Sequence, residues 1–551
     1  MPRLKFNNLR GDIFGGVTAA VVALPLALAF GVASGVGPIA GLYGAMFVGF
    51  FAALFGGTPS QVSGPTGPMT VVMAATVAAL MAKNPDTGLA MAFTVVMVGG
   101  LLQILMGVLR LGKYITLMPY VVISGFMSGV GVIIILLEIG PLLGYETSGS
   151  VMDAVRQYPT IFSNIDPNAT WLGILTLAIV FAAPARLNRI IPAPLIALVV
   201  CTVISVRYFP NSGIPRIGDI PSGLPSLQLP QITLANFKDM LGYSIMLAVL
   251  GALDSLLTSL VADSITRTQH DSNRELMGQG NGNILSEMFG GLPGARDTMR
   301  TVINVRSGGK TNLSGIIHAL TLAVIVLGAG PLTEPIPHAV LAGILIKVGI
   351  DIIDWGFLRR AHRLSAEGAG LMYLVMGLTV FVDLITAVAV GVFLANLLTI
   401  QALTDIQVKD MRAVTQGDNE NWLTPDERSL LKAAKGRILM FHLSGPMSFG
   451  AAKSISRQLS IVENYEILIL DLTTVPRLGV TTLLAIETLI KDALDKHREV
   501  FLVGAQDQVN RRLQRLDIVQ KLPPTHQVRE RIAALDQSMA LLRDYAPPAE
   551  V

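Results

Sequence analysis

The stretch Gly56-Gly-Thr-Pro-Ser-Gln-Val-Ser-Gly-Pro-Thr-Gly-Pro-Met-Thr70, GGTPSQVSGPTGPMT, separates two long apolar runs near the start of the chain. It contains four glycines and three prolines, the residues that fit least well inside a helix. It also carries a row of small hydroxyl side chains. Its meaning depends on whether the flanking apolar runs cross a membrane.

Composition indicates that they do. The chain has 551 residues, of which 52% are hydrophobic and 14% are charged, and its mean hydropathy is +0.59. Soluble domains carry about 25% charged residues. The basic residues are scattered, which argues against nucleic acid as a partner. No hydrolase, phosphate-binding or metal-ligand motif is present, so nothing favours an enzyme. The single cysteine, Cys201, excludes an intramolecular disulfide.

The first 404 residues predict a helical transmembrane domain of about fourteen spans. Several apolar segments approach the length of about 20 residues that a spanning helix needs. The segments that begin at 64, 277 and 297 are shorter, or open on glycine and proline. The predicted segments are 11–34, 40–55, 64–82, 88–109, 118–142, 169–185, 190–206, 239–262, 277–289, 297–306, 313–331, 336–354, 368–384 and 386–403.

The distribution of basic residues predicts the orientation of these spans. Fourteen lysines and arginines fall in the stretches that this count places inside, against five in the outward loops. Cytoplasmic loops of membrane proteins carry such an excess of basic residues. We therefore expect a multi-pass protein of the plasma (inner) membrane of a cell, with both termini in the cytoplasm.

The remainder of the chain predicts a small α/β domain. Residues 405–435 are polar and read as a linker, and the domain would occupy 436–551. Three apolar runs at 438–443, 466–472 and 499–505 are typical of buried strands, and 481–497 shows an amphipathic helical pattern. Strands that alternate with helices favour an α/β fold.

The opening stretch has a partner in the second half of the chain. Its start, FGGTP at 55–59, recurs as FGGLP at 289–293, and each copy leads into a short apolar helix. Paired segments interrupted by glycine and proline mark the binding site of many transporters. Two half-helices that enter from opposite sides point their N-termini at one place, which attracts an anion. The alternative is a pair of ordinary interhelical loops.

Ionisable residues inside predicted spans refine this hypothesis. Asp254 and Thr258 lie one turn apart on the same helical face, and their oxygens suit Na⁺ or a proton. Alternatively, Asp254 caps a helix or pairs with an arginine. Lys347 and Asp351, four residues apart, are interpreted as a structural pair.

Further ionisable residues occur at the second break and at segment ends. The stretch GARDTMRTV (294–302) carries Arg296, Asp297, Thr298 and Arg300 at the start of the second half-helix. An arginine there offers a permanently charged anion ligand, whereas a local Asp297–Arg300 ion pair is the equally open alternative. Glu138, Glu287 and Asp383 lie near segment ends and are expected to reach water.

At these residues the sequence resembles the sulfate permease (SulP) family of anion transporters, and within it the members that carry bicarbonate. The most specific stretches are GGTPSQVSGPTGPMTVV (56–72), SGFMSGVG (124–131), ADSITRTQHDSNRELMGQG (262–280) and VRSGGKT (305–311). The stretch ILILDLTTVPRLGVTTLLAIE (467–487) resembles a STAS domain, and Thr481 falls where regulatory STAS domains carry a phosphorylated Ser or Thr.

The resemblance implies a fold of seven plus seven inverted repeats, divided into core and gate domains that move like an elevator. It also implies a homodimer supported by the STAS domain. Bicarbonate would face Thr66, and Na⁺, the coupling ion, would be held by Asp254, Thr258, Thr298 and main-chain groups at Arg296 and Asp297.

This chain departs from the bicarbonate-transporting members at the second break. Those members have small residues where this chain has Arg296, Asp297 and Arg300. Arg300 aligns with an arginine that many SulP carriers use near their substrate, so we expect Asp297, Thr298 and Arg300 to join Thr66 around the anion. Proton-coupled transport of sulfate or a dicarboxylate is one alternative. A membrane receptor or scaffold that signals through the STAS-like tail is another.

Overall fold

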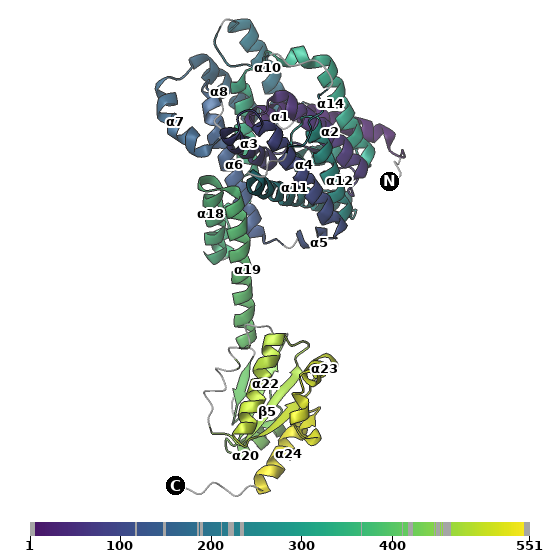
Figure 1. Cartoon of the computed structure of the whole chain (residues 1–551), viewed down its shortest axis with the longest axis vertical. Coiled ribbons are helices and arrows are strands. Elements are labelled where there is room, and N and C mark those ends of the chain that lie inside the picture. Colours follow the sequence, from purple (N-terminus) through teal and green to yellow (C-terminus); the bar gives the residue numbers. More distant parts are fainter. Residues whose placement is uncertain are drawn as a thin grey trace. The chain divides into compact units, whose positions relative to one another are not determined.

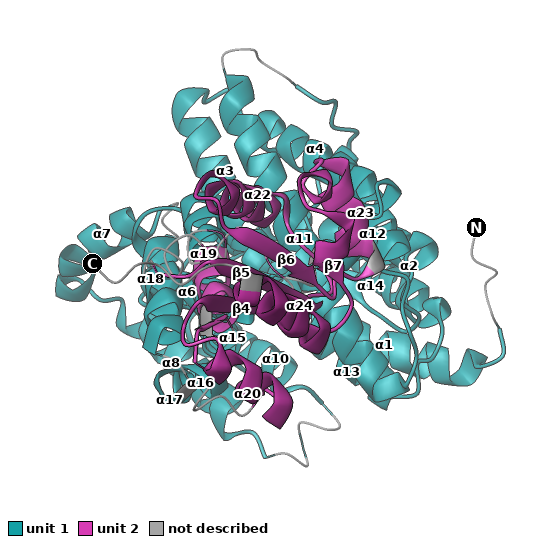
Figure 2. Ribbon diagram, turned by 90° about the horizontal axis from the view of Figure 1, so that it is seen from below, with its two compact units in different colours: residues 1–395 teal, residues 396–551 magenta. Residues whose placement is uncertain are grey.

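The computed structural model describes residues 6–544, except 116–117, 147–149, 185–186, 188–190, 211, 219–224, 232–235, 365, 410, 417–421, 446, 448–451, 453–454 and 456–463. The chain divides into two compact units, Met1–Ala395 and Asn396–Val551 (Figure 2). The first unit is helical and the second is a mixed α/β structure (Figure 1).

Each of the fourteen predicted apolar segments contains a helix of the structure. The helices that begin in the first unit are α1 (Leu9–Ala33), α2 (Pro38–Phe55), α3 (Gly67–Lys83), α4 (Gly88–Val108), α5 (Gly112–Ile115), α6 (Tyr120–Leu142), α7 (Val151–Ser163), α8 (Pro167–Ala182), α10 (Ala193–Tyr208), α11 (Phe237–Thr266), α12 (Ser272–Met288), α13 (Thr298–Arg306), α14 (Asn312–Thr333), α15 (His338–Ile352), α16 (Trp355–Leu358), α17 (Ala361–Leu364), α18 (Ala366–Phe381) and α19 (Leu384–Lys409).

Within the described residues, six helices are individually long and apolar enough to cross a membrane: α1, α2, α4, α6, α11 and the Leu384–Gln407 part of α19. The pair α7 and α8 would add a seventh, although it bends by 115° at its break. Among the other predicted segments, α3, α10 and α18 are apolar helices of fewer than 18 residues. The helix α7 was not predicted as a separate element, because its one polar face hides it from a search for apolar runs.

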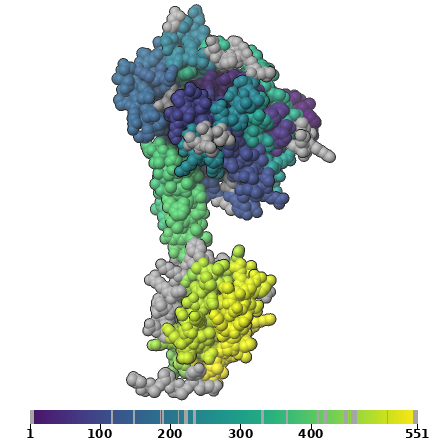
Figure 3. All heavy atoms as spheres, viewed as in Figure 1, coloured from purple at the N-terminus to yellow at the C-terminus, as the bar shows by residue number. Residues whose placement is uncertain are grey.

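Helix α19 carries large apolar side chains on its surface. The helix belongs to the green segment of the space-filling view (Figure 3). Phe393 is 67% exposed and Leu397 is 49% exposed, and Leu403 is also exposed. Exposed apolar side chains along a whole helix indicate a lipid-facing surface rather than an aqueous one.

Small residues allow the helices around the centre of the first unit to pack closely. A Cβ atom on Gly100 of α4 would lie 2.7 Å from the carbonyl oxygen of Gly280, and one on Gly280 of α12 would lie 2.4 Å from that of Gly100. The backbones of α4 and α12 therefore touch, as small residues permit in membrane helices. This contact fixes α12 beside the second break.

The two helix-breaking stretches meet as a two-stranded sheet. Strand β1 (Ser63–Gly64) pairs antiparallel with β2 (Ala295–Arg296), with Ser63 opposite Arg296 and Gly64 opposite Ala295. All four residues are buried. The prediction of two broken helices at equivalent places, in the third and tenth spans, is confirmed, and the ordinary-loop alternative is wrong.

The second unit contains one five-stranded sheet in the order β3-β4-β5-β6-β7. Only the β3–β4 pair is antiparallel. The strands are β3 (Arg412–Val414), β4 (Ile438–Ser444), β5 (Ile467–Thr474), β6 (Glu499–Val503) and β7 (Gln527–Val528), and the helices are α20 (Pro425–Ala433), α22 (Val480–Asp495), α23 (Asp507–Arg515) and α24 (Arg531–Asp544).

Alternating side chains of the sheet supply two cores. Leu439, Phe441 and Leu470 point to the face that is covered by α22 and α23. Met440 and Ile469 point to the other face, which is covered by α20 and α24. Both faces are buried, which explains why the predicted strands are almost continuously apolar. Thr481 lies exposed in the first turn of α22, and its phosphorylation stays a prediction.

The structure changes the boundaries of the predicted linker at 405–435. Helix α19 continues to Lys409, and β3 then joins the sheet beside β4. The helix α20 packs against α24, and its Leu431 is fully buried. Polar composition concealed these elements because β3 is a three-residue edge strand and α20 buries only one face. The α/β unit therefore includes most of the predicted linker.

The two-sided core predicts the effect of a cavity in β5. Leu470→Ala should lower the free energy of unfolding of the α/β unit by about 3 kcal/mol, because Leu470 is fully buried. Hydrogen exchange of β5 amides in the purified full-length protein measures this loss. The control Leu484→Ala, at a side chain that is 48% exposed, should leave the exchange unchanged. Equal exchange in both variants would contradict the proposed core.

Candidate functional site

The centre of the first unit is formed by the start of two half-helices. Helix α3 follows β1 with Thr66 as its N-cap, and α13 follows β2 with Asp297 as its N-cap. The β1–β2 pairing therefore brings both N-termini to one place. The first amide N–H groups of a helix have no partner within the helix, and they carry a partial positive charge.

The two N-cap residues differ in whether their side chains cap the helix that follows. The Asp297 carboxylate accepts a hydrogen bond from the Arg300 amide at 2.7 Å, so it caps its own helix. The Thr66 side chain makes no capping bond. Its hydroxyl oxygen is buried and makes no hydrogen bond of ordinary geometry within the described part of the chain. The N-terminus of α3 consequently offers amides that have no partner within the helix, and the Thr66 hydroxyl, which lies beside the Asp254 carboxylate.

Arg300 connects the two half-helices. Its side chain is 1% exposed, and Nη2 donates to the Pro65 carbonyl oxygen at 2.6 Å. The same nitrogen lies 3.4 Å from Asp297 Oδ2, so the local ion pair that the sequence left open does form. A Cβ on Gly64 would lie 2.5 Å from Arg300 Nη1, which explains the glycine at that position. Nε of Arg300 is buried with no hydrogen-bond partner among the described residues.

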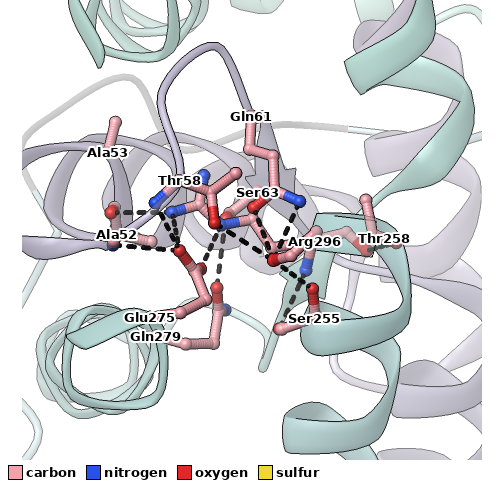
Figure 4. Close-up of polar contacts among 12 residues, drawn as sticks. Ala52, Ala53, Thr58, Gln61, Ser63, Ser255, Thr258, Glu275, Gln279 and Arg296 are labelled. Carbon is pink, nitrogen blue, oxygen red and sulfur yellow. Dashed lines mark hydrogen bonds and ion pairs between the residues drawn. The ribbon is translucent and has the colours of Figure 1, made fainter. Parts of the chain in front are cut away.

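Arg296 has a different role, because its side chain contacts Glu275 and Ala52 (Figure 4). Its guanidinium pairs with the buried Glu275 of α12 through Nε and, at 3.0 Å, through Nη2. Nη2 also donates to the Ala52 carbonyl oxygen at 3.1 Å. Glu275 Oε2 accepts from the amides of Gly57 and Thr58, each at 3.0 Å. This ion pair ties the first broken stretch to the second.

A second buried contact set on α12 holds the two strands. Gln279 accepts a hydrogen bond from the Ser63 hydroxyl at 3.0 Å and donates to the Gly294 carbonyl oxygen at 2.8 Å. One turn further, Asn283 accepts from the Gly294 amide at 2.8 Å. Glu275, Gln279 and Asn283 recur every four residues, so they lie along one face of α12. Sequence reasoning missed them, although this spacing of polar residues was a visible signal.

Oxygen atoms gather beside the start of α13. The Thr258 hydroxyl lies 2.8 Å from the Thr298 hydroxyl and donates to the Arg296 carbonyl oxygen at 3.2 Å. Asp254 lies one turn before Thr258 on α11, and its Oδ2 is buried with no hydrogen-bond partner of ordinary geometry among the described residues. Uncharged and carboxylate oxygens are the ligands of hard cations such as Na⁺.

The same carboxylate connects this oxygen cluster to the half-helices. Asp254 lies beside the Thr66 hydroxyl and interacts electrostatically with Asp297 and Arg300. With Arg296 neutralised by Glu275, and with Asp254 and Asp297 counted as carboxylates and Arg300 as a guanidinium, the centre has a formal charge of −1. The structure therefore brings together all the predicted site residues. Arg296 takes part only through its main chain, because its side chain pairs with Glu275.

An apolar cavity leads to Asp254. It has a volume of about 210 Å³ and lies between α6, α11 and α19. Its wall includes Phe126, Met246, Leu250 and Val388, and Asp254 is the only charged residue among those that line it.

Two predictions for ionisable residues need correction, and two are confirmed. Glu138 and Glu287 do not reach water, because they are 4% and 0% exposed. Position near the end of an apolar segment does not report depth when neighbouring helices extend past that end. Asp383 is exposed as expected. The Lys347–Asp351 pair forms as predicted, and Lys347 also lies over the ring of Phe181.

The fold and the site define a multi-pass membrane transporter in which two half-helices meet at the centre. The chain belongs to the sulfate permease family, which it matches over residues 9–375, and it carries a STAS domain at residues 430–532. The known members that it matches are transporters rather than enzymes.

Known proteins agree with this assignment. The bicarbonate transporter BicA of Synechocystis sp. is 51% identical over 541 residues, which cover 98% of this chain and 96% of that protein. The solved transmembrane domain of a cyanobacterium BicA is 56% identical, with a TM-score of 0.67 over 70% of this chain and 99% of that one. Murine Slc26a9 in its inward-facing state shares the fold, with a TM-score of 0.82, 18% identity and coverage of 98% and 92%.

The Arg296–Glu275 contact predicts a specific pattern of stability. Glu275→Gln should destabilise the first unit by about 3–5 kcal/mol, because it leaves a buried guanidinium without its carboxylate. Glu275→Gln combined with Arg296→Met should recover part of this loss. Thermal unfolding of the purified protein in detergent compares the variants. Equal melting temperatures for the wild type and the single variant would show that the pair does not hold the breaks together.

Proposed function

We propose that this protein takes up bicarbonate with Na⁺ by an elevator-like movement, with the anion held between the N-termini of α3 and α13. The observation that carries the proposal is the β1–β2 pairing, which places a free hydroxyl, an arginine and an oxygen cluster around one point. The extensive similarity to proteins named bicarbonate transporter BicA supports bicarbonate as the anion.

The anion half of the site suits a small monoanion. Amides at the start of α3 and the Thr66 hydroxyl can donate to bicarbonate oxygens, as helix N-termini do for other anions. Arg300 Nε supplies a further donor and a permanent charge. Asp297 accepts a hydrogen bond from the Arg300 amide and pairs with its guanidinium, so we assign it to orienting Arg300. Its contact with the anion stays a prediction.

Electrostatics favours the entry of a cation together with the anion. With Asp254 ionised, the site has a formal charge of −1. Bicarbonate alone would make this charge −2 in a region with little water. One Na⁺ restores the original charge. The hydroxyls of Thr258 and Thr298, the Arg296 carbonyl oxygen and the Asp254 carboxylate are the groups that would hold it.

The packing of helices supports a two-body movement. Helix α12 packs against both α2 and α4, and α2 also packs against β1. Helix α6 packs instead with α15 and α18. The apolar cavity at Asp254 lies at the boundary between α11 and α6. Its apolar side chains make no hydrogen bonds that would have to break when the two helices slide past each other. The movement would carry the half-helices and their bound ions past α6.

The remaining features of the proposal concern cellular context. The excess of basic residues in the predicted inner loops supports a plasma (inner) membrane location with cytoplasmic termini. A homodimer supported by the STAS domain follows from the family resemblance. Protease protection in oriented vesicles tests the side of the membrane on which the termini lie. The mass of the purified protein in nanodiscs tests the homodimer.

A second candidate is proton-coupled transport of sulfate or a dicarboxylate, which the buried Arg300 favours. A permanent positive charge beside the anion site suits a dianion better than a monoanion. In that mechanism the proton would replace Na⁺ at Asp254.

Uptake into proteoliposomes separates the two candidates. We expect labelled bicarbonate to accumulate when a sodium gradient is imposed, and not when potassium replaces sodium. Labelled sulfate should accumulate under neither condition. Sulfate uptake driven by a proton gradient, without bicarbonate uptake, would replace the first candidate by the second.

The role of Asp254 predicts the loss of sodium coupling in Asp254→Asn, because the amide removes the only charged ligand from the oxygen cluster. Sodium-driven uptake should fall by at least about tenfold, which corresponds to roughly 1.4 kcal/mol of lost binding. The matched control is Asp239→Asn on the same helix, whose carboxylate pairs with Lys83 at the surface. It should transport like the wild type, whereas equal losses in both variants would exclude a specific role.

The free hydroxyl of Thr66 predicts a loss of anion affinity in Thr66→Val. A hydrogen bond to a charged group contributes about 1.5–3 kcal/mol, so KM for bicarbonate should rise by about 10–100-fold. Thr66→Ser should retain most of the affinity. The control Thr76→Val lies on the same helix, and its hydroxyl bonds only to the Val72 carbonyl oxygen. A normal KM in Thr66→Val would remove Thr66 from the anion site.

A further inference from the structure

Glu138 of α6 faces a small cavity that the proposed transport mechanism does not use. The cavity has a volume of about 10 Å³ and lies between α1, α3, α6 and α15. Its wall is otherwise formed by apolar residues such as Phe30, Ile134 and Leu345, and by one further polar side chain, Thr70. A cavity of this size has room for about one water molecule.

The polar groups in this cavity have no hydrogen-bond partner among the described side chains. The Thr70 hydroxyl oxygen is buried and makes no hydrogen bond within the described part of the chain. Glu138 is 4% exposed, and no hydrogen bond or ion pair joins its carboxylate to a described side chain. A hydroxyl and a carboxylate that face one water-sized space form a built polar site rather than a packing defect.

Among the described neighbouring residues, no charged side chain neutralises the carboxylate of Glu138. The cavity residues from α1, α3 and α15 include no titratable group. On α15, Lys347 pairs with Asp351. On α7, the Tyr158 hydroxyl donates to the Leu136 carbonyl oxygen of α6. From α18, the uncharged Thr379 packs on α6. An ionised carboxylate in such surroundings is much more costly than a neutral acid, so a bound proton is the cation that fits.

The position of Thr70 links this cavity to the anion site. The Thr70 amide donates to the Thr66 carbonyl oxygen at 2.9 Å, so the two threonines lie one turn apart on the same face of α3. Glu138 belongs to α6, which packs with the other group of helices. The cavity therefore lies between the half-helix that holds the anion and the helix past which it would move.

We propose that Glu138 and Thr70 form a second ion site of this transporter, which binds a proton while α3 packs against α6. When the two helices separate, water reaches the carboxyl group and takes up the proton. The proposal rests on the two-body movement described above. It assigns to Glu138 a role that is separate from Na⁺ binding at Asp254.

The first test measures sodium-driven bicarbonate uptake in proteoliposomes between about pH 6 and about pH 9, with the bicarbonate concentration held constant at each pH. Closure of α3 on α6 requires the proton, so wild-type uptake should slow as the pH rises. Glu138→Gln carries a permanent neutral group and should keep its rate at high pH. Glu138→Asp, which retains a carboxyl group, should restore the dependence. A pH profile of Glu138→Gln that matches the wild type would overturn the proposal.

A second test needs no transport and therefore separates this proposal from the proposed function. Ala74 lines the same cavity, and Ala74→Cys in a Cys201→Ser background places a thiol there. The rate of its modification by a small methanethiosulfonate reports how often α3 and α6 separate. The rate with Glu138, divided by the rate with Glu138→Gln, should increase with pH. This ratio cancels the ionisation of the thiol itself, and a constant ratio would overturn the proposal even if bicarbonate uptake is absent.

Discussion

The fold depends on hydrogen-bond partners for the backbone groups of two interrupted helices inside a membrane. Two interrupted helices leave amides and carbonyls that neither lipid nor a regular helix can satisfy. The β1–β2 pairing satisfies some of these groups, and α12 satisfies others through Glu275, Gln279 and Asn283. The N-cap side chain of α3 makes no capping hydrogen bond. The broken backbone that holds the fold together is thus also the place where we propose that the anion binds.

The charged residues of the second break divide into two functions once the structure is known. Arg296 is neutralised by Glu275 and belongs to the scaffold, whereas Arg300 lies between the half-helices, where it contacts Pro65 and Asp297. Asp297 caps α13 and orients Arg300. The extra charge of this chain therefore adds no net positive charge to the site.

Sequence alone predicted the elements whose signal is local. The repeated FGG motif and the glycine–proline content marked both breaks, and the apolar runs marked β4, β5 and β6. The partner of Arg296 was not predictable, because Glu275 comes from another helix that packing brings close. The burial of Glu138 and Glu287 was missed for a similar reason, since depth depends on neighbouring helices. Strand β3 was not predicted, because a three-residue strand at a sheet edge shows no clear alternation of apolar and polar residues.

The central claim is that the anion and the cation bind to one coupled site. Reciprocal binding to the purified protein tests it most directly, because coupling between two ligands must be equal in both directions. Isothermal titration should show that Na⁺ increases the affinity for bicarbonate, and that bicarbonate increases the affinity for Na⁺ by the same factor. A bicarbonate affinity that does not change when potassium replaces sodium would contradict the account.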